Sequence, residues 1–179
     1  MQPSTASPDR IRFDQPKAGL QRLSARFGGH AYDLHRHETY AVGLTIWGAQ
    51  SFHYRGSLRT SRAGQVMIIH PDEAHDGHAG VDRGFAYRML YVDPGAVSAA
   101  LEGASPPFVP EVVTEDPMLS GLLSEAFGDF PRPLEPLAQD AIVGRLAERL
   151  AERLVRQGFH ARAITGDVDQ RKQIGRAHV

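Results

Sequence analysis

The chain has 179 residues, of which 41% are hydrophobic and 23% are charged, values typical of a globular domain and not of a disordered chain. Its 20 basic and 21 acidic residues give a formal net charge of −1, which argues against DNA contact by this stretch, because phosphate binding favours a basic surplus. The absence of cysteine excludes a disulfide scaffold, a thiolate zinc site and a cysteine nucleophile.

The N-terminal end has the pattern of neither a signal peptide nor a membrane anchor. Residues 1–15 are polar, contain several prolines and serines, and predict a flexible N-terminal arm. No run in the chain approaches the ~18 apolar residues that a membrane-spanning helix needs. We therefore expect a cytoplasmic protein without a membrane partner.

Residues 16–100 carry the signals of short strands separated by turns. The runs at 40–47, 65–70 and 85–92 are rich in β-branched, aromatic and other apolar residues, and the run at 51–55 alternates between apolar and polar residues. Glycine or proline stands at or next to the end of each run. Short strands at this spacing, with no helical period between them, predict a β-barrel or β-sandwich.

The pattern changes to a helical one in residues 101–158. After a proline-rich connection, Asp116 followed by Pro117 is typical of a helix N-cap with proline at the first helical position. Two prolines end this first helix, and a second helix is expected from about residue 137 to 157, stopped by Gly158. The sequence therefore predicts a mainly β fold with a C-terminal α-helical hairpin.

The second predicted helix has one apolar stripe, and the opposite face is charged. The stripe consists of Val143, Leu146, Ala147, Leu150 and Leu154. Such a stripe either packs on the barrel of its own chain or forms an antiparallel helix–helix seam in a homodimer, because both arrangements need one apolar face. The two alternatives are equally compatible with the sequence.

Three of the nine histidines have a spacing that brings them together in a barrel. His35 and His37 are two residues apart and share one face of a strand, while His75 follows a turn at the end of a later strand. Neutral imidazoles bind zinc, iron or nickel, and they also form hydrogen bonds with small polar ligands. No nucleophile paired with a base is visible, so we expect no catalytic residue and no enzyme activity.

Two segments resemble the halves of the cupin metal motif. The matching residues are Gly29, His35 and His37 in the first half, and Gly64, Pro71 and His75 in the second. Cupin enzymes usually place a glutamate four or five residues after the second histidine, but Ala41 and Val42 stand there. Glu73 replaces the usual glycine of the second half. These departures favour a polar pocket with no metal and no cofactor.

A longer match resembles the N-terminal sensor domain of AraC-family transcription regulators. It is carried by residues 35–45, 64–66, 70–77 and 87–94, and extends over about residues 20–157. The resemblance implies a cupin-like (jelly-roll) β-barrel followed by a two-helix dimerisation hairpin. It also implies a small effector inside the barrel, a homodimer formed by the C-terminal helix, and DNA binding through a C-terminal helix-turn-helix domain that this sequence does not contain.

Strand alternation within this fold assigns the candidate ligand-binding residues. The inward-facing set is His35, His37, Thr39, His75, Tyr87 and Met89. For Tyr87 and Met89 ordinary core packing is the alternative to ligand contact.

Three functional hypotheses follow. The preferred one is the effector-sensing and dimerisation domain of an AraC-type regulator. The rival is a small metal-dependent cupin enzyme, a dioxygenase or isomerase that uses His35, His37 and His75. The third is a stand-alone binding protein. Residues 159–179 are expected to be a linker and a truncated end, and the last seven residues suggest translated sequencing adapter.

Overall fold

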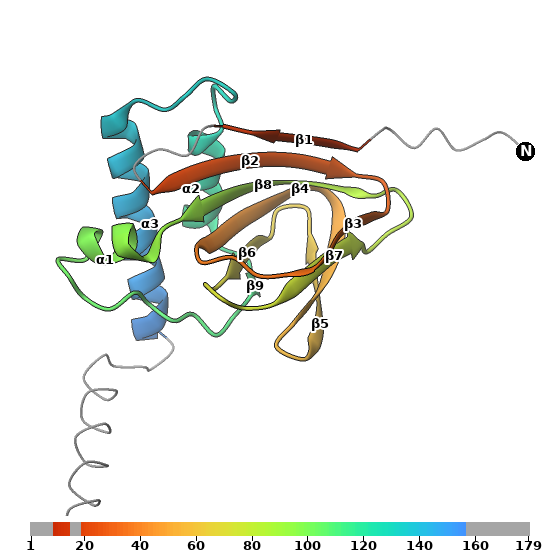
Figure 1. Cartoon of the computed structure of the whole chain (residues 1–179), viewed down its shortest axis with the longest axis horizontal. Coiled ribbons are helices and arrows are strands. Elements are labelled where there is room, and N and C mark those ends of the chain that lie inside the picture. Colours follow the sequence, from red (N-terminus) through yellow and green to blue (C-terminus); the bar gives the residue numbers. More distant parts are fainter. Residues whose placement is uncertain (1–8, 15–18, 157–179) are drawn as a thin grey trace, which may run out of the picture.

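The computed structural model describes residues 9–14 and 19–156 of the chain. These residues form nine strands and three helices, and the helices lie beside the strands (Figure 1). The strands are β1 (Arg10–Phe13), β2 (Leu20–Phe27), β3 (His30–His35), β4 (Tyr40–Tyr54), β5 (Ser57–Arg62), β6 (Val66–Ile69), β7 (His75–Ala79), β8 (Phe85–Val92) and β9 (Val113–Thr114). The helices are α1 (Pro94–Ala100), α2 (Pro117–Ala126) and α3 (Pro136–Arg156).

The strands form two antiparallel sheets that share the long strand β4. One sheet has the order β1-β2-β8-β4-β6-β9, and the other joins β3 to β7 and pairs β7 and β5 with the second half of β4. Strand β4 bends between the sheets at a bulge after Thr45 and at Gly48, whose φ is 69°. A Cβ atom on Gly48 would lie 2.1 Å from the Gly84 carbonyl oxygen, so this bend requires glycine. The cupin-like barrel predicted from the sequence is confirmed.

Both faces of the central strands are buried, and each face contributes to a different apolar cluster. On β8, Leu90 and Val92 pack against the helices, whereas Phe85, Tyr87 and Met89 point into the barrel. The helices lie together on one side of the barrel (Figure 1). The barrel interior is thus lined by alternate residues of strands that the helices hold from outside.

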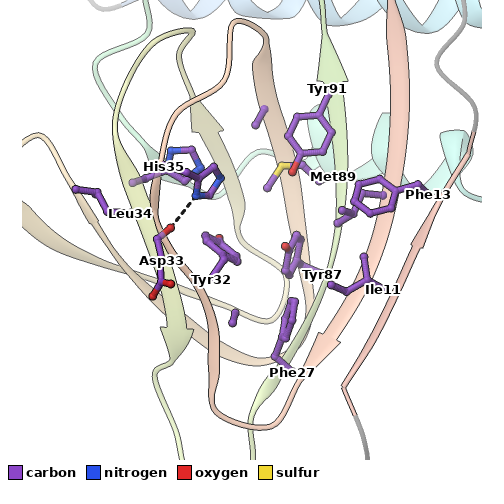
Figure 2. Close-up of a pocket in the computed structure, with 14 residues that line it drawn as sticks. Ile11, Phe13, Phe27, Tyr32, Asp33, Leu34, His35, Tyr87, Met89 and Tyr91 are labelled. Carbon is purple, nitrogen blue, oxygen red and sulfur yellow. Dashed lines mark hydrogen bonds between the residues drawn. The ribbon is translucent and has the colours of Figure 1, made fainter.

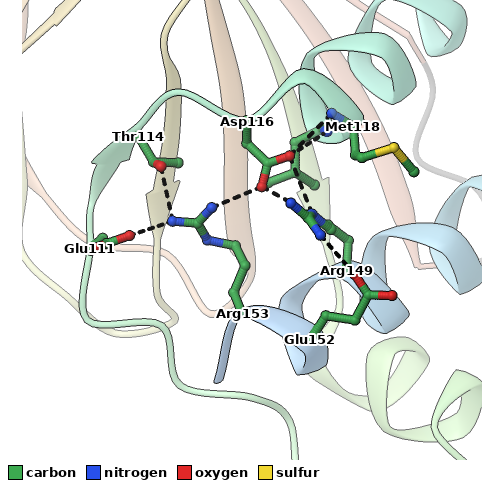
Figure 3. Close-up of polar contacts among 8 residues, drawn as sticks. Glu111, Thr114, Asp116, Met118, Arg149, Glu152 and Arg153 are labelled. Atoms are coloured by element: carbon green, nitrogen blue, oxygen red, sulfur yellow. Dashed lines mark hydrogen bonds and ion pairs between the residues drawn. The ribbon is translucent and has the colours of Figure 1, made fainter. Parts of the chain in front are cut away.

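Helix α2 begins where the sequence predicts. The Asp116 carboxylate accepts hydrogen bonds from the backbone N–H groups of Met118 and Leu119, both at 3.1 Å. It also receives Arg149 at 3.0 Å and Arg153 at 2.8 Å from α3 (Figure 3). Burial alone raises the pKa of this carboxyl group, but the hydrogen bonds outweigh burial and lower the pKa. Asp116 therefore caps one helix and anchors another.

Two predictions about element boundaries are wrong. Residues 10–13 lie in the predicted flexible arm, but they form β1, which pairs with β2 along its whole length. Helix α1 is absent from the prediction: it lies at the end of residues 16–100, which the sequence assigns to the barrel, and it brings the helices of the described residues to three. Asp93 caps this helix and Pro94 is its first residue, the same Asp-Pro pattern that begins α2. The rest of the predicted arm and the predicted linker at 159–179 lie mainly or wholly outside the described residues.

The apolar stripe of α3 lies inside the core of a single chain. Val143 is 6% exposed, and Leu146, Ala147 and Leu150 are fully buried in the cluster shared with α2 and the sheet. Leu154 is half-buried. These four buried residues follow the first alternative, packing within the chain. Their side chains are not available as a dimer seam while this core is intact, so the predicted assignment of these four residues to dimerisation is corrected.

Candidate ligand-binding cavity

A cavity of about 400 Å³ lies inside the barrel (Figure 2). Figure 2 shows residues of β8 on one side of it and residues of β3 on the other. Its lining consists of Ile11, Phe13, Leu23, Phe27, Ala31, Tyr32, Asp33, Leu34, His35, Ala41, His75, Tyr87, Met89 and Tyr91. Most of these side chains are apolar or aromatic, and the polar groups among them are few and close together, which is usual for small-molecule sites.

A second cavity of about 480 Å³ adjoins the first and shares Phe13, His35 and Tyr91 with it. Its lining consists of Phe13, Gly19, Leu20, Gln21, His35, His37, Thr39, Tyr91 and Asp93. The histidines thus stand where the two cavities meet.

Three histidines come together from two strands and a loop. His35 ends β3 and pairs with His75, the first residue of β7, and His37 lies in the loop before β4. The ring centroid of His75 lies 4.4 Å from that of His35 and 4.9 Å from that of His37. One ring nitrogen of each histidine lies within 4.8 Å of the other two. We refer to His35, His37 and His75 as the histidine triad.

Backbone carbonyl groups determine the tautomer of each triad ring. The Nδ1 atoms of His35, His37 and His75 lie 2.9, 2.8 and 3.0 Å from the carbonyl oxygens of Asp33, Thr39 and Glu73 respectively. Because a carbonyl oxygen only accepts, each Nδ1 donates, and a neutral ring then carries a lone pair on Nε2. Among the described residues, the buried His37 Nε2 atom has no hydrogen-bond partner.

Burial keeps the inner two rings uncharged. It lowers the pKa of His75 from 6.5 to about 4, with a further lowering by His35 and His37 and an opposing contribution from the Glu73 carbonyl group. Burial also lowers the pKa of His37. His35 is exposed at the mouth of the cavity. At neutral pH His37 and His75 therefore present imidazole lone pairs instead of positive charge.

Tyrosine hydroxyl groups complete the polar part of the cavity. Burial raises the pKa of Tyr32 and of Tyr87, and it raises the pKa of Tyr91 to about 12. The Tyr32 ring meets the His35 and His75 rings edge-on, with centroids 5.1 and 6.2 Å apart. These hydroxyl groups stay protonated at neutral pH and can donate hydrogen bonds.

No lysine or arginine lies among the described residues that line the two cavities. Each cavity has one carboxylate in its lining, Asp33 in the first and Asp93 in the second. The Asp33 side chain is 97% exposed, and Asp93 caps α1. The lining therefore offers hydrogen-bond acceptors and aromatic faces, but no permanent positive charge.

All six predicted ligand-binding residues line one of the two cavities. His35, His75, Tyr87 and Met89 line the first, and His37 and Thr39 line the second. The strand argument for His37 and Thr39 is wrong, because β3 ends at His35 and both residues lie in the following loop. Ligand contact by any of the six stays a prediction.

The sequence analysis missed several lining residues. Tyr91 follows the same alternation as Tyr87 and Met89, so the signal for it was present. Tyr32 was harder to find, because irregularities in the β3–β7 pairing interrupt the alternation there. The Phe13 side chain reaches the cavities only because β1 pairs with β2.

A strand barrel with such a cavity defines a cupin-like ligand-binding domain, and comparison with known proteins gives the family. A model of the AraC-like ligand binding domain matches residues 17–154. The chain belongs to this family. None of the curated proteins matches the chain.

Three solved structures are similar to parts of the chain. A cupin 2 conserved barrel domain protein from Salinispora arenicola is 18% identical, with a TM-score of 0.43 over 49% of this chain and 77% of that chain. A cupin domain of an XRE-family transcriptional regulator from Enterobacter cloacae is 16% identical, with a TM-score of 0.43 over 48% of this chain and 97% of that chain. AerE from Microcystis aeruginosa is 11% identical, with a TM-score of 0.49 over 64% of this chain and 53% of that chain.

Proposed function

We propose that this protein senses a small-molecule effector in the barrel and serves as the sensor domain of an AraC-type transcription regulator. The observation that carries the proposal is the pair of adjoining cavities, which the histidine triad and three tyrosines line together with aromatic and aliphatic side chains. The family match over residues 17–154 supports it. The protein would bind its effector without transforming it, because no nucleophile paired with a base stands in the described lining.

The proposal extends to the partners that the family resemblance implies. We infer that the chain acts as a homodimer in the cytoplasm and that DNA is contacted by a helix-turn-helix module. The net charge of −1 fits a domain that does not bind phosphate groups itself. Among the described helices, none is long and apolar enough to cross a membrane.

A thermal-shift screen over sugars, aromatic acids, amines and amino-acid derivatives tests effector binding. An effector at a hundred times its Kd stabilises a protein by about 2.7 kcal/mol. For a chain of this size that corresponds to a rise in Tm of roughly 5–10 °C.

Two matched variants locate the site. His75→Phe should abolish the shift, because it removes one acceptor of the triad. His53→Phe should preserve it, because the His53 side chain is 60% exposed on the outside of β4. A shift that survives His75→Phe and is lost in His53→Phe would place the site outside the barrel.

Metal binding by the triad is a second candidate function. Three Nε2 lone pairs oriented by Nδ1–H···O=C bonds are the arrangement in which proteins usually present histidine to a metal. His35, His37 and His75 would hold the ion, which would act as a Lewis acid on a bound substrate. Metal analysis of protein purified without chelator tests this, and one equivalent that disappears in His75→Phe but not in His53→Phe would support it.

A further inference from the structure

Resting on the proposed effector site, we propose that the triad receives the ammonium group of a primary amine whose aromatic or apolar body occupies the rest of the cavity. The ring nitrogens of the triad face one another as hydrogen-bond acceptors, with no donor between them. They therefore require a ligand that carries several hydrogen-bond donors. A primary ammonium group has three N–H donors, and it carries the charge that converging lone pairs attract.

The spacing of the triad fits a hydrogen-bonded nitrogen better than a metal ion. Ring nitrogens that lie within 4.8 Å of one another allow one central atom to lie about 2.8 Å from all three, close to the usual N–H···N or N–H···O length. A zinc ion needs nitrogens at about 2.0–2.1 Å, so two ring nitrogens at the upper limit of 4.8 Å would have to move closer together to share one ion. The glutamate that usually completes the cupin metal set is also absent, because Ala41 and Val42 stand in its place.

The charges of the lining select the same class of ligand. No lysine or arginine lines either cavity among the described residues, so a carboxylate or phosphate ligand would find no positive partner there. Asp33 and Asp93 instead place a negative charge at the edge of each cavity.

The remaining lining accommodates the body of the ligand. Aromatic faces attract ammonium groups. The ring centroid of Tyr32 lies 5.1 Å from that of His35, and the ring centroid of Tyr91 lies 5.2 Å from that of His37. Beyond them Phe27, Tyr87 and Met89 form an apolar wall. An aromatic ring two carbons away from the nitrogen fits this order of polar and apolar groups.

Calorimetry with four probes that share one phenethyl body tests the proposal. The probes are phenethylamine, phenethyl alcohol, N,N,N-trimethylphenethylammonium and hydrocinnamate, each titrated near neutral pH into the full chain after dialysis against a chelator. We expect phenethylamine to bind at least tenfold more tightly than the alcohol, which lacks the charge, and the trimethyl compound, which lacks N–H donors. Hydrocinnamate should show no binding.

Variants connect the preference to the triad. His75→Phe and His37→Phe should each weaken the binding of phenethylamine at least tenfold and leave the affinity for the alcohol unchanged. Far-ultraviolet circular dichroism checks that each variant is folded. His53→Phe should change neither ligand. If one triad variant does not fold, the other variant and the titration of the four probes into the wild-type protein still test the proposal.

Several results would overturn the proposal. If the trimethyl compound bound as tightly as phenethylamine, N–H donors would not be needed for binding. If the alcohol or hydrocinnamate bound more tightly than phenethylamine, the cavity would not prefer a positive charge. Silence of all four probes would also reject the amine. The effector screen is a separate measurement, so an effector of another class would leave the proposed function standing.

Discussion

At the scale of single residues, the buried ring of His75 has a lowered pKa, which makes the stability of the fold depend on pH. Its folded-state pKa of about 4 lies below the ordinary value of 6.5, so the unfolded chain binds more protons between these two values. Stability must then rise with pH across this window, and it is lost as the pH falls from about 6.5 to about 4. Above the window the contribution is complete.

We expect His75 to contribute at most roughly 3–4 kcal/mol to the pH dependence of unfolding, because one pKa unit corresponds to about 1.4 kcal/mol. Urea unfolding of the wild type and of His75→Phe at several pH values measures this. The difference between the two proteins isolates the histidine from carboxyl groups that also protonate in acid. Parallel stability curves across the window would show that His75 is not buried in its neutral form.

At the scale of elements, Asp116 connects the start of α2 to the middle of α3. It is 2% exposed, accepts two backbone hydrogen bonds and pairs with Arg149 and Arg153. Glu111, which precedes β9, and Thr114, the last residue of β9, also contact Arg153 (Figure 3). Removal of this carboxylate would leave two guanidinium groups short of a partner in a partly buried place.

We expect Asp116→Ala to destabilise the fold by about 3 kcal/mol, from the lost cap and the broken ion pairs. Asp116→Asn keeps a capping oxygen and should lose less. The matched control is Glu125→Gln, which breaks an ion pair with Arg145 whose two side chains are 59% and 50% exposed and should change little. Urea midpoints of the three variants decide the order, and an equal loss in all three would refute the central role of Asp116.

At the scale of the whole molecule, the helices form a core with the outer face of the sheet. Since Leu146, Ala147 and Leu150 are fully buried there, a homodimer built on α3 must use its outer side. Leu137 is 81% exposed on that helix, and Ala141 is exposed one turn later. The expected dimer contact therefore moves from the predicted stripe to the opposite face.

We expect the double substitution Leu137→Arg and Ala141→Arg to raise the dimer dissociation constant at least tenfold, because charge would be buried without a partner. Leu58→Arg, at a residue that is 56% exposed on β5, is the matched control and should leave the dimer intact. Sedimentation equilibrium measures both. A wild type that stays monomeric at high concentration would end the expectation of a homodimer.

Much of this architecture could be predicted from local pattern, and the failures have physical causes. Period-two alternation correctly indicated that Tyr87 and Met89 face the barrel interior, and Asp116 with Pro117 correctly marked a helix start. The pairing of β1 and the burial of the α3 stripe depend on contacts between distant segments, which no local period encodes. The convergence of His37 on His75 arises from a loop whose conformation alternation does not describe.

Histidine-selective nitrogen NMR of the full chain tests the central claim most directly, namely that the triad presents unprotonated Nε2 atoms to a ligand inside the barrel. We expect neutral His37 and His75 rings at neutral pH, protonated at Nδ1, whose Nε2 signals move when an effector from the screen is added. Rings that titrate near the ordinary histidine pKa, carry the proton on Nε2 and ignore every effector would contradict it.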